Sequence, residues 1–449
     1  MVGCKKPSTN NPPEDLPNVD LHKCSENISD WQIVEPVVCG VNNRQKVCLK
    51  CNQVLETDTY MEYHDYNKVT IKDPTCTENG IEFHQCKKCD YNYETPTNAL
   101  GHSSGELEIT ETPTLSTIGK RNLHCARCNE VIKTYTYVAN NYHFNGKLSV
   151  VGPDLVNKDG EKFQLYGLST HGIQWFGRYC NFETIAAITS EFGINIIRFA
   201  FYTGEAGYCS GNKVVQEQML ADLHEGVKAA TSLGLYVIID WHMVGATEPL
   251  DKNPLTYLEE SKAFFSYISE YYKDQDNILY EIMNEPNGST TWADCKKYAN
   301  EVIPCIRKNT DAIILVGNPR WTADLNSVMK DPLVGYENIM YTYHFYARDH
   351  KRTTQVENAY DAGFPVFISE FGFMNSDGDG PISKTNGENW RKVLDSRNIS
   401  YVAWNISNSE GSASIFKHNS SRMDDVTDSN LKEWGVYLKN WYRSKSGLA

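Results

Sequence analysis

The chain has 449 residues, which is long for a single domain and sufficient for two or three. Its net charge of −14 argues against nucleic acid as the main partner, because phosphate backbones bind basic surfaces. No apolar run reaches the ~18 residues that a membrane-spanning helix needs, although a hydrophobic content of 40% is enough to form a core.

Residues 1–20 predict a flexible tether, because this first segment is rich in Pro, Asn, Ser and Thr. At its start, Val2-Gly3-Cys4 resembles the end of a bacterial lipoprotein signal. That resemblance implies that Cys4 is lipidated and that the protein is extracellular or held at the cell surface. A cysteine without a lipid is the alternative, and the sequence leaves it open.

Residues 21–140 form a cysteine-rich region, since ten of the 14 cysteines lie in the first 128 residues. The region repeats itself with a period of 38 to 39 residues. Alternating polar and apolar residues, as in 68–71 and 106–109, predict β-hairpins in these repeats. The period is kept by three prolines and three Cys-x-x-Cys pairs: Pro36, Pro74 and Pro113, with Cys48/Cys51, Cys86/Cys89 and Cys125/Cys128.

The first two repeats each carry three cysteines and one histidine, a ligand set suited to tetrahedral zinc. One disulfide per repeat is the alternative, because an exported protein would oxidise such cysteines. The third repeat has Leu115 and Asn141 where the first cysteine and the histidine are expected, so its pair is left as two thiols or one disulfide. We expect two structural zinc sites, each within one repeat: Cys39, Cys48, Cys51 and His64, and Cys76, Cys86, Cys89 and His102.

The second repeat resembles a repeat found in cell-surface proteins of gut Firmicutes. The resemblance rests on Asp73-Pro74-Thr75-Cys76, the following Cys-x-x-Cys pair and Ala99-Leu100-Gly101-His102. It implies a spacer or attachment module and not a catalyst. A unit this small cannot bury enough apolar surface alone, so a cross-link would have to supply its fold.

Residues 145–445 have a different pattern, in which strand-like runs alternate with helical stretches such as 215–233 and 255–272. Eight βα units over roughly 300 residues predict an α/β fold of the (β/α)8 TIM-barrel type. A doubly wound open sheet is the alternative, but 169–173 lacks the Gly-rich phosphate loop usual in its first turn. The predicted strands are 164–168, 195–201, 236–240, 278–283, 313–316, 339–343, 366–369 and 401–404.

The chemistry of a barrel lies where its strands end. Glu285 and Glu370 each follow a buried apolar run, and a carboxylate there is costly unless it has a partner or a task. Two carboxylates on one face predict acid–base chemistry on glycosidic bonds. Seven of the eight predicted strands deliver a polar or aromatic group to this face: His171, Arg198, His242, Asn284 with Glu285, His344 with Tyr346, Glu370 and Trp404.

These strand ends resemble glycoside hydrolase family 5, and within it the bacterial endoglucanases, over residues 150–443. The resemblance implies a retaining endo-β-1,4-glucanase, or cellulase, that hydrolyses internal bonds of cellulose or a related β-glucan without a cofactor and acts as a monomer. It rests on Asn284-Glu285-Pro286, Ser369-Glu370-Phe371-Gly372, Ile197-Arg198-Phe199, Asp240-Trp241-His242, His344-Phe345-Tyr346-Ala347 and Trp404-Asn405.

The family roles carry over to the matching positions. Glu285 would be the acid/base and Glu370 the nucleophile, which requires carboxyl groups ~5 Å apart, so that their repulsion favours a proton on Glu285. Arg198 and Tyr346 would hold Glu370 ionised, and Asn284 would bind the sugar 2-hydroxyl. The remaining positions would contact sugar rings: His242 and His344 in the cleavage subsite, Trp404 below it, His171 and Trp175 on the non-reducing side, and Trp321 on the leaving-group side.

One stretch departs from the endoglucanase pattern. Ser409 and Gly411 stand where a Lys and a Glu usually grip distal glucose units, unless Glu410 replaces the latter. The departure leaves the polymer open, with mannan, xylan, xyloglucan and mixed-linkage glucan as alternatives to cellulose. A surface protein that binds glycans without cleaving them is the alternative from another functional class.

Overall fold

The structure is a computed structural model that describes residues 23–114, 117–245 and 252–448. The chain divides into two compact units, residues 1–106 with 124–132 and residues 107–123 with 133–449. We call them the N-terminal unit and the barrel unit and describe each by itself. Within the described residues, no helix combines the length and apolar content needed to cross a bilayer. The predicted tether and Cys4 lie outside these residues.

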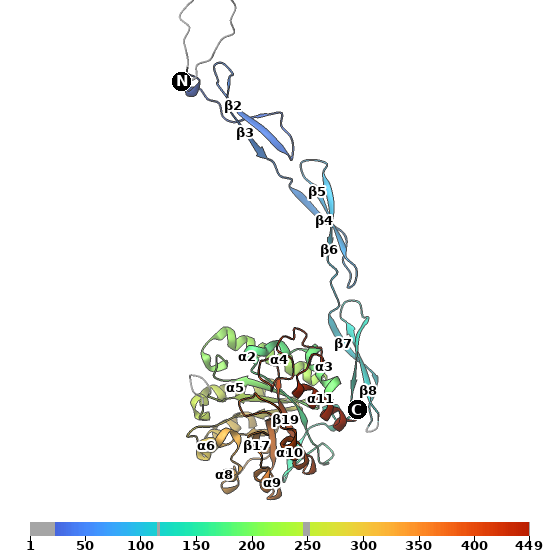
Figure 1. The fold of residues 1–449 in the computed structure, drawn as a ribbon, viewed down its shortest axis with the longest axis vertical. Helices are drawn as coiled ribbons and strands as arrows, with labels where there is room; N and C mark the ends of the chain where they lie inside the picture. Colours follow the sequence, from blue (N-terminus) through green and yellow to red (C-terminus); the bar gives the residue numbers. More distant parts are fainter. Residues whose placement is uncertain (1–22, 115–116, 246–251, 449) are drawn as a thin grey trace, which may run out of the picture. The chain divides into compact units, whose positions relative to one another are not determined.

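The three repeats fold as three small β-sheets, each of three strands (Figure 1). The predicted hairpins therefore gain a third strand. In the first two sheets all strand pairs are antiparallel. The strands are β1 (Gln32–Val34), β2 (Val41–Val47) and β3 (Val54–Met61); β4 (Tyr66–Lys72), β5 (Gly80–Cys86) and β6 (Asn92–Thr97); and β7 (Ser104–Glu111), β8 (Gly119–Cys125) and β9 (Val131–Tyr137).

Eight parallel strands close into a barrel, which confirms the predicted (β/α)8 fold. The first strand pairs with both the second and the eighth, and this pairing closes the ring. All eight predicted strands are present, with ends shifted by a few residues. They are β12 (Tyr166–Thr170), β13 (Ile196–Tyr202), β14 (Tyr236–His242), β15 (Ile278–Glu281), β16 (Ile314–Val316), β17 (Ile339–Tyr346), β18 (Val366–Gly372) and β19 (Tyr401–Ile406).

Helices surround the barrel strands (Figure 1). Their starts are set by side-chain caps: Asn181 and Asn212 accept backbone N–H groups, and Thr291 forms a capping box with Asp294. The helices are α1 (Tyr142–Asn145), α2 (Ile173–Phe176), α3 (Phe182–Phe192), α4 (Lys213–Ser232), α5 (Leu258–Tyr271), α6 (Trp292–Arg307), α7 (Pro319–Thr322), α8 (Leu325–Lys330), α9 (Thr354–Asp361), α10 (Lys384–Ser396) and α11 (Glu433–Ser446).

The two ends of the barrel differ in chemistry. At the amino ends of the strands, a small apolar cluster includes Ile196, Tyr236 and Val402. Residues around the hairpin of β10 (Ser149–Val151) and β11 (Asp154–Val156) pack into that cluster. This end is therefore filled with apolar side chains, and the carboxyl ends of the strands are left for polar groups.

The third sheet is shared between the two units. Leu123 of β8 and Tyr135 of β9 are each only 2% exposed and belong to the main core of the barrel unit. Arg121 donates to the carbonyl of Leu233, and the backbone N–H of Thr136 donates to Ser190 Oγ. The residues at the position of Leu123 in the first two repeats are Lys46 and His84, so the repeat period gave no sign of this contact.

Candidate active site

Strands β13, β17 and β18 bring together the side chains around Glu370, with Arg198 inside β13 and Tyr346 at the end of β17. Its carboxylate is 5% exposed and accepts hydrogen bonds from Arg198 Nη1 (3.2 Å) and Tyr346 Oη (2.8 Å). These two hydrogen bonds, one to each carboxylate oxygen, fix the orientation of the Glu370 side chain.

Glu285 lies just after β15 and has a different partner. His344 Nδ1 donates to Glu285 Oε1 over 2.8 Å, and the Glu285 side chain retains 13% exposure. One oxygen of Glu285, one ring nitrogen of His344 and one oxygen of Glu370 all lie within 4.8 Å of one another. The two carboxyl groups therefore stand at the short separation found in retaining glycosidases and not at the wider spacing of inverting ones.

Asn284 is buried and its amide is fully engaged. Its Oδ1 accepts from Arg198 Nη2 (2.7 Å), while its Nδ2 donates to the carbonyl of Met243 (3.2 Å) and contacts His242 Nε2 (3.3 Å). Thr322 Oγ1 also donates to the backbone carbonyl of Asn284 (2.5 Å). These contacts fix the residue that precedes Glu285, which in turn limits the positions open to the Glu285 side chain.

A layer of charged residues below the two glutamates was missed by the sequence interpretation. Arg198 donates to Glu281 Oε2 (2.7 Å) and lies 2.9 Å from Asp240 Oδ2, all three side chains being completely buried. Ser369 Oγ donates to Glu281 Oε1 over 2.6 Å. The available signal was one charged residue in each of three consecutive apolar strands, β13, β14 and β15, since such a charge needs a partner.

Two histidines of the site differ in charge: His344 is protonated and His242 is neutral. Ser369 uses its hydrogen on Glu281, so it accepts from His344 Nε2 (2.9 Å) while His344 Nδ1 donates to Glu285. Both ring nitrogens of His344 are thus protonated. Although burial opposes this charge, hydrogen bonds to Glu281 and Glu285 raise the pKa of His344 to about 9.

His242 is neutral by the same reasoning. Its Nδ1 donates to Asp240 Oδ2 (2.6 Å), which leaves Nε2 as the acceptor that faces Asn284. Burial and the nearby charge of Arg198 lower the pKa of His242 to about 3. Burial opposes the ionisation of Glu281, but Arg198 and His344 lower the pKa of that carboxyl to about 2.

Aromatic rings line the same mouth. Trp404 stacks on His242 at 5.3 Å between ring centroids and also contacts His171 (5.1 Å). Trp175 follows β12, is 42% exposed and contacts Tyr202, a residue of this wall that the sequence interpretation also missed. Rings with one exposed face suit the apolar faces of sugars.

Trp321 lies on a strained segment next to Glu285. Arg320, Trp321 and Thr322 have φ of 61°, 55° and 55°, a left-handed conformation that costs non-glycine residues about 1–3 kcal/mol each. The Trp321 N–H donates to the carbonyl of Pro286 (3.0 Å), and its side chain is 56% exposed. The segment therefore holds an exposed ring beside the acid/base candidate.

The loop that departs from the endoglucanase pattern contains a lysine contact that the sequence did not reveal. Lys432 Nζ donates to the carbonyls of Ser409 (2.6 Å), Glu410 (2.9 Å) and Gly411 (2.7 Å). Its three donors are thereby used within the loop. The Glu410 side chain is 88% exposed.

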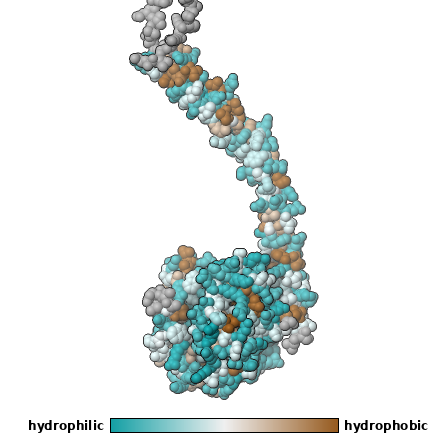
Figure 2. Space-filling view, viewed as in Figure 1, coloured by the Kyte–Doolittle hydropathy of each residue, from teal (hydrophilic) through white to brown (hydrophobic). Residues whose placement is uncertain are grey.

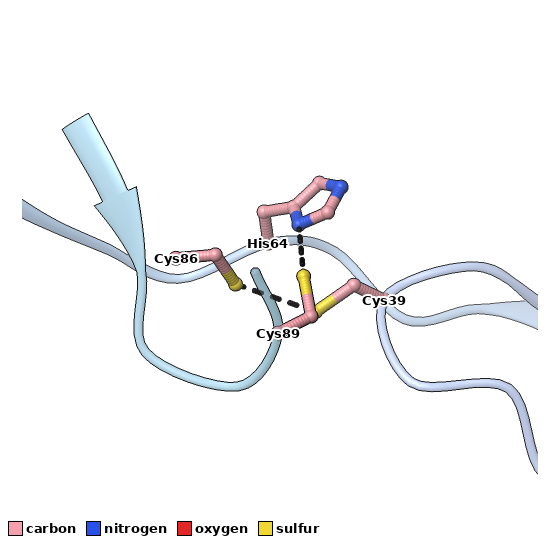
Figure 3. A group of neighbouring side chains, drawn as sticks. All are labelled: Cys39, His64, Cys86 and Cys89. Carbon is pink, nitrogen blue, oxygen red and sulfur yellow. Dashed lines mark hydrogen bonds between the residues drawn. The ribbon is translucent and has the colours of Figure 1, made fainter. Parts of the chain in front are cut away.

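The predicted metal ligands do come together, but in a different grouping. Cys39 and His64 lie with Cys86 and Cys89 of the next repeat, and not with the pair of their own repeat (Figure 3). The same holds for Cys76, His102, Cys125 and Cys128, while Cys24 joins Cys48 and Cys51. Each Cys-x-x-Cys pair lies at one end of its sheet, whereas the single Cys and His lie at the other, so one repeat cannot assemble a complete set.

Comparison with known proteins agrees with the fold. The family model for cellulase (glycosyl hydrolase family 5) matches residues 156–410. Endoglucanase A of Butyrivibrio fibrisolvens is 43% identical over 299 residues, 66% of this chain and 68% of that protein. The endoglucanase of Clostridium saccharobutylicum is 37% identical over 310 residues, 68% of this chain and 67% of that protein.

Solved structures give the same result. Cellulase Cel5C_n has a TM-score of 0.63 with 35% identity and covers 68% of this chain and 93% of its own. The catalytic domain of Thermobifida fusca endoglucanase Cel5A has a TM-score of 0.62 with 32% identity and covers 67% of this chain and 99% of its own. From the barrel, its paired glutamates and these relatives, it follows that this chain is a glycoside hydrolase and belongs to the cellulase family, glycosyl hydrolase family 5.

Proposed function

We propose that this chain is a retaining endo-β-1,4-glucanase that cleaves internal bonds of cellulose or a related β-glucan by double displacement. The observation that carries the proposal is the placement of Glu285 and Glu370, whose oxygens lie within 4.8 Å of each other but whose partners differ. Relatives at 43% and 37% identity are named endoglucanases, which supports the substrate class.

In the first step, Glu370 attacks the anomeric carbon while Glu285 protonates the departing glycosidic oxygen. Arg198 and Tyr346 donate hydrogen bonds to Glu370 and aim it, so little reorganisation is needed as the covalent bond forms. The result is a glycosyl-enzyme ester and a free sugar end. In the second step, Glu285, now anionic, takes a proton from water, which displaces Glu370.

The supporting residues orient the sugar rings around this centre. Asn284 binds the 2-hydroxyl, and Trp404 with His242 forms the floor beneath the ring that is attacked. His171 and Trp175 bind the sugar on the non-reducing side, and Trp321 stacks on the leaving-group side. Positioning of this kind lowers the activation barrier because the reacting groups are already aligned.

The test is hydrolysis of carboxymethylcellulose by Glu370→Gln, a near-isosteric change that removes the nucleophile. We expect at least a ~100-fold loss of activity with an unchanged thermal transition. Glu270→Gln, on an exposed part of α5, is the matched control and should retain full activity. A Glu370→Gln protein with more than about a hundredth of the original rate would refute the nucleophile assignment.

The loop at Ser409 supports a second group of candidate substrates, in which the polymer is not cellulose. Because Lys432 is engaged by three carbonyl groups, the loop offers no lysine head group to distal sugars. Mannan, xylan, xyloglucan or mixed-linkage glucan would then be preferred with the same chemistry. Initial rates on the purified polysaccharides separate these substrates, and the chemistry is unaffected by the outcome.

The N-terminal repeats serve, in this proposal, as a spacer that attaches the enzyme at the cell surface. The resemblance of residues 73–102 to surface-protein repeats supports this role. A lipid on Cys4 would supply the anchor. Mass spectrometry of the N-terminal peptide from the membrane fraction tests it: the unmodified mass would exclude acylation and leave the barrel chemistry untouched.

A further inference from the structure

The N-terminal unit contains two groups of four ligand-type side chains that play no part in the barrel chemistry. In each group, three sulfur atoms and one imidazole nitrogen lie within 4.8 Å of one another. Figure 3 shows the first group, in which the three thiols and the His64 ring converge on a common point. All eight side chains belong to the N-terminal unit. The two groups are Cys39, His64, Cys86 and Cys89, and Cys76, His102, Cys125 and Cys128.

The distances within these groups fit a tetrahedral zinc site. Bond lengths of ~2.3 Å to sulfur and ~2.0–2.1 Å to nitrogen give tetrahedron edges of about 3.8 Å between two sulfurs and about 3.6 Å between sulfur and nitrogen. The sulfurs of Cys39 and Cys86 are 3.5 Å apart, and Cys89 Sγ lies 3.5 Å from His64 Nδ1. In the second group, the corresponding distances are 3.7 Å and 3.4 Å.

The surroundings of the groups favour metal-bound thiolates over a disulfide. The backbone N–H of Lys88 donates to Cys86 Sγ over 3.4 Å, and that of Arg127 donates to Cys125 Sγ over the same distance. Tyr91 stacks on the His64 ring at 4.7 Å. Such outer contacts orient ligands and stabilise their charge. A disulfide needs a sulfur–sulfur distance near 2.05 Å and would leave the third thiol of each group without a partner.

The N-terminal unit buries few other side chains. Within the described part of the N-terminal unit, the buried apolar side chains are Val47 and four cysteines: Cys24, Cys48, Cys86 and Cys125. Isoleucines and valines such as Ile33, Val38 and Ile71 lie on the surface, which appears as brown patches along the repeats in Figure 2. Sheets this small need a cross-link or a metal to fold stably.

We propose that each group binds one zinc ion and that each ion joins two consecutive repeats. The first ion would be bound by Cys39, which precedes β2, and His64, which follows β3, both from the first repeat. Its other two ligands would be Cys86 and Cys89, at the β5–β6 turn of the second repeat. The second ion joins the second and third sheets in the same way. Each site therefore fixes one repeat to the next, and three thiol protons are released for each zinc bound.

The ending of the repeat array supports this arrangement independently. The third repeat keeps the Cys-x-x-Cys pair that would accept the preceding repeat. It lacks the single Cys and the His, which are replaced in sequence by Leu115 and Asn141. Those two ligands would be needed only if a fourth repeat followed. Asn141 instead caps α1 of the barrel unit.

Two double variants of the full-length chain separate this arrangement from zinc held within single repeats. If ions join consecutive repeats, Cys39→Ser/Cys86→Ser damages one site only, whereas Cys76→Ser/Cys86→Ser damages both. If each repeat held its own ion, the losses would be reversed. The readout is zinc per chain by mass spectrometry after dialysis against a competing chelator, which strips sites that have lost a ligand.

We expect the first variant to lose about one equivalent of zinc relative to the unmodified chain and the second to lose about two. Both should keep full activity on carboxymethylcellulose, since no ligand touches the barrel site, and both should be cleaved faster by protease within residues 23–132. The reversed pattern would overturn the inter-repeat arrangement. An unmodified chain that carries no zinc and contains disulfides between these cysteines would overturn the metal proposal itself.

Discussion

The two units of this protein achieve order by opposite means. The barrel strands are buried along their whole length, as in β13 and β18, and their helices cover a large apolar core. The sheets of the N-terminal unit are largely exposed: β6 alternates between exposed and partly buried residues, β3 is mostly exposed, and the unit buries little besides sulfur. Hydrophobic burial can therefore stabilise the barrel unit without help, whereas the N-terminal unit would depend, in our zinc proposal, on a few Cys and His ligands.

The largest difference between the units is expected in the unfolding free energy lost when a paired arginine of each unit is replaced by methionine. Arg198 is fully buried among Asp240, Glu281 and Glu370, so Arg198→Met leaves three carboxylates without their cation. Breaking a buried ion pair from one side costs about 3–5 kcal/mol of unfolding free energy. Arg44 pairs with Asp58 on the surface of the first sheet, and such pairs contribute about 0–1 kcal/mol.

Denaturant unfolding followed by tryptophan fluorescence reports the stability of the barrel unit in both variants, because eight of the nine tryptophans lie in that unit. Arg44→Met is the control for removing a guanidinium as such. An Arg198→Met protein as stable as Arg44→Met would mean that the buried carboxylates take up protons without loss, and the charged layer would not be a stabilising feature of the barrel.

The next effect concerns the third sheet, which belongs in part to the barrel unit. Leu123 is 2% exposed in the barrel core, so Leu123→Ala should lower the unfolding free energy of the barrel by about 2–5 kcal/mol. Val131 of the same sheet is 50% exposed, and Val131→Ala should change it by no more than about 0.5 kcal/mol. Equal, small effects would show that the barrel does not depend on this sheet.

Much of the barrel could be predicted from the sequence because its signals are local. Each strand is a short apolar run, and each functional group follows the run directly, as Glu285 and Glu370 do. The buried layer of Glu281 and Ser369 was missed because these side chains act through Arg198 and His344, which requires knowledge of contacts between strands.

The repeats show why spacing alone fails. A period of 38 to 39 residues is unchanged when a Cys and a His are grouped with the pair of their own repeat or with that of the next. Only the direction of the strands, which separates Cys39 from the turn of its own sheet, distinguishes the two groupings. Six of the eight side chains in the two groups were therefore predicted from sequence, whereas Cys125 and Cys128 were left out and Cys48 and Cys51 were wrongly included.

A smaller effect follows from His344. Its pKa is raised from the ordinary value of 6.5 to about 9, so the folded state holds a proton that the unfolded state releases between these values. This contribution to stability is complete below pH 6.5 and is lost as the pH rises through 9. In that window the unfolding free energy should fall by about 1.4 kcal/mol per pH unit.

The variant His344→Gln isolates the contribution of His344 to the pH dependence of stability, because Gln keeps a hydrogen-bond donor but does not titrate. Its unfolding free energy, measured by denaturant titration at several pH values from 6.5 to 9, should show a shallower slope than that of the unmodified chain. Parallel curves would assign the alkaline loss to other groups, among them the thiols of the N-terminal unit.

The smallest effect is expected at Trp321, whose ring is exposed and whose backbone is strained. In the proposed mechanism it stacks on the leaving-group side, so Trp321→Ala should lower kcat/KM on soluble polymer by about 2- to 10-fold, the equivalent of one aromatic contact. The free energy of unfolding should change little, because no core contact is removed. Trp31 of the N-terminal unit is the matched control, and Trp31→Ala should leave kcat/KM unchanged. A Trp321→Ala enzyme with unchanged kcat/KM would leave the three left-handed residues without a role in substrate binding.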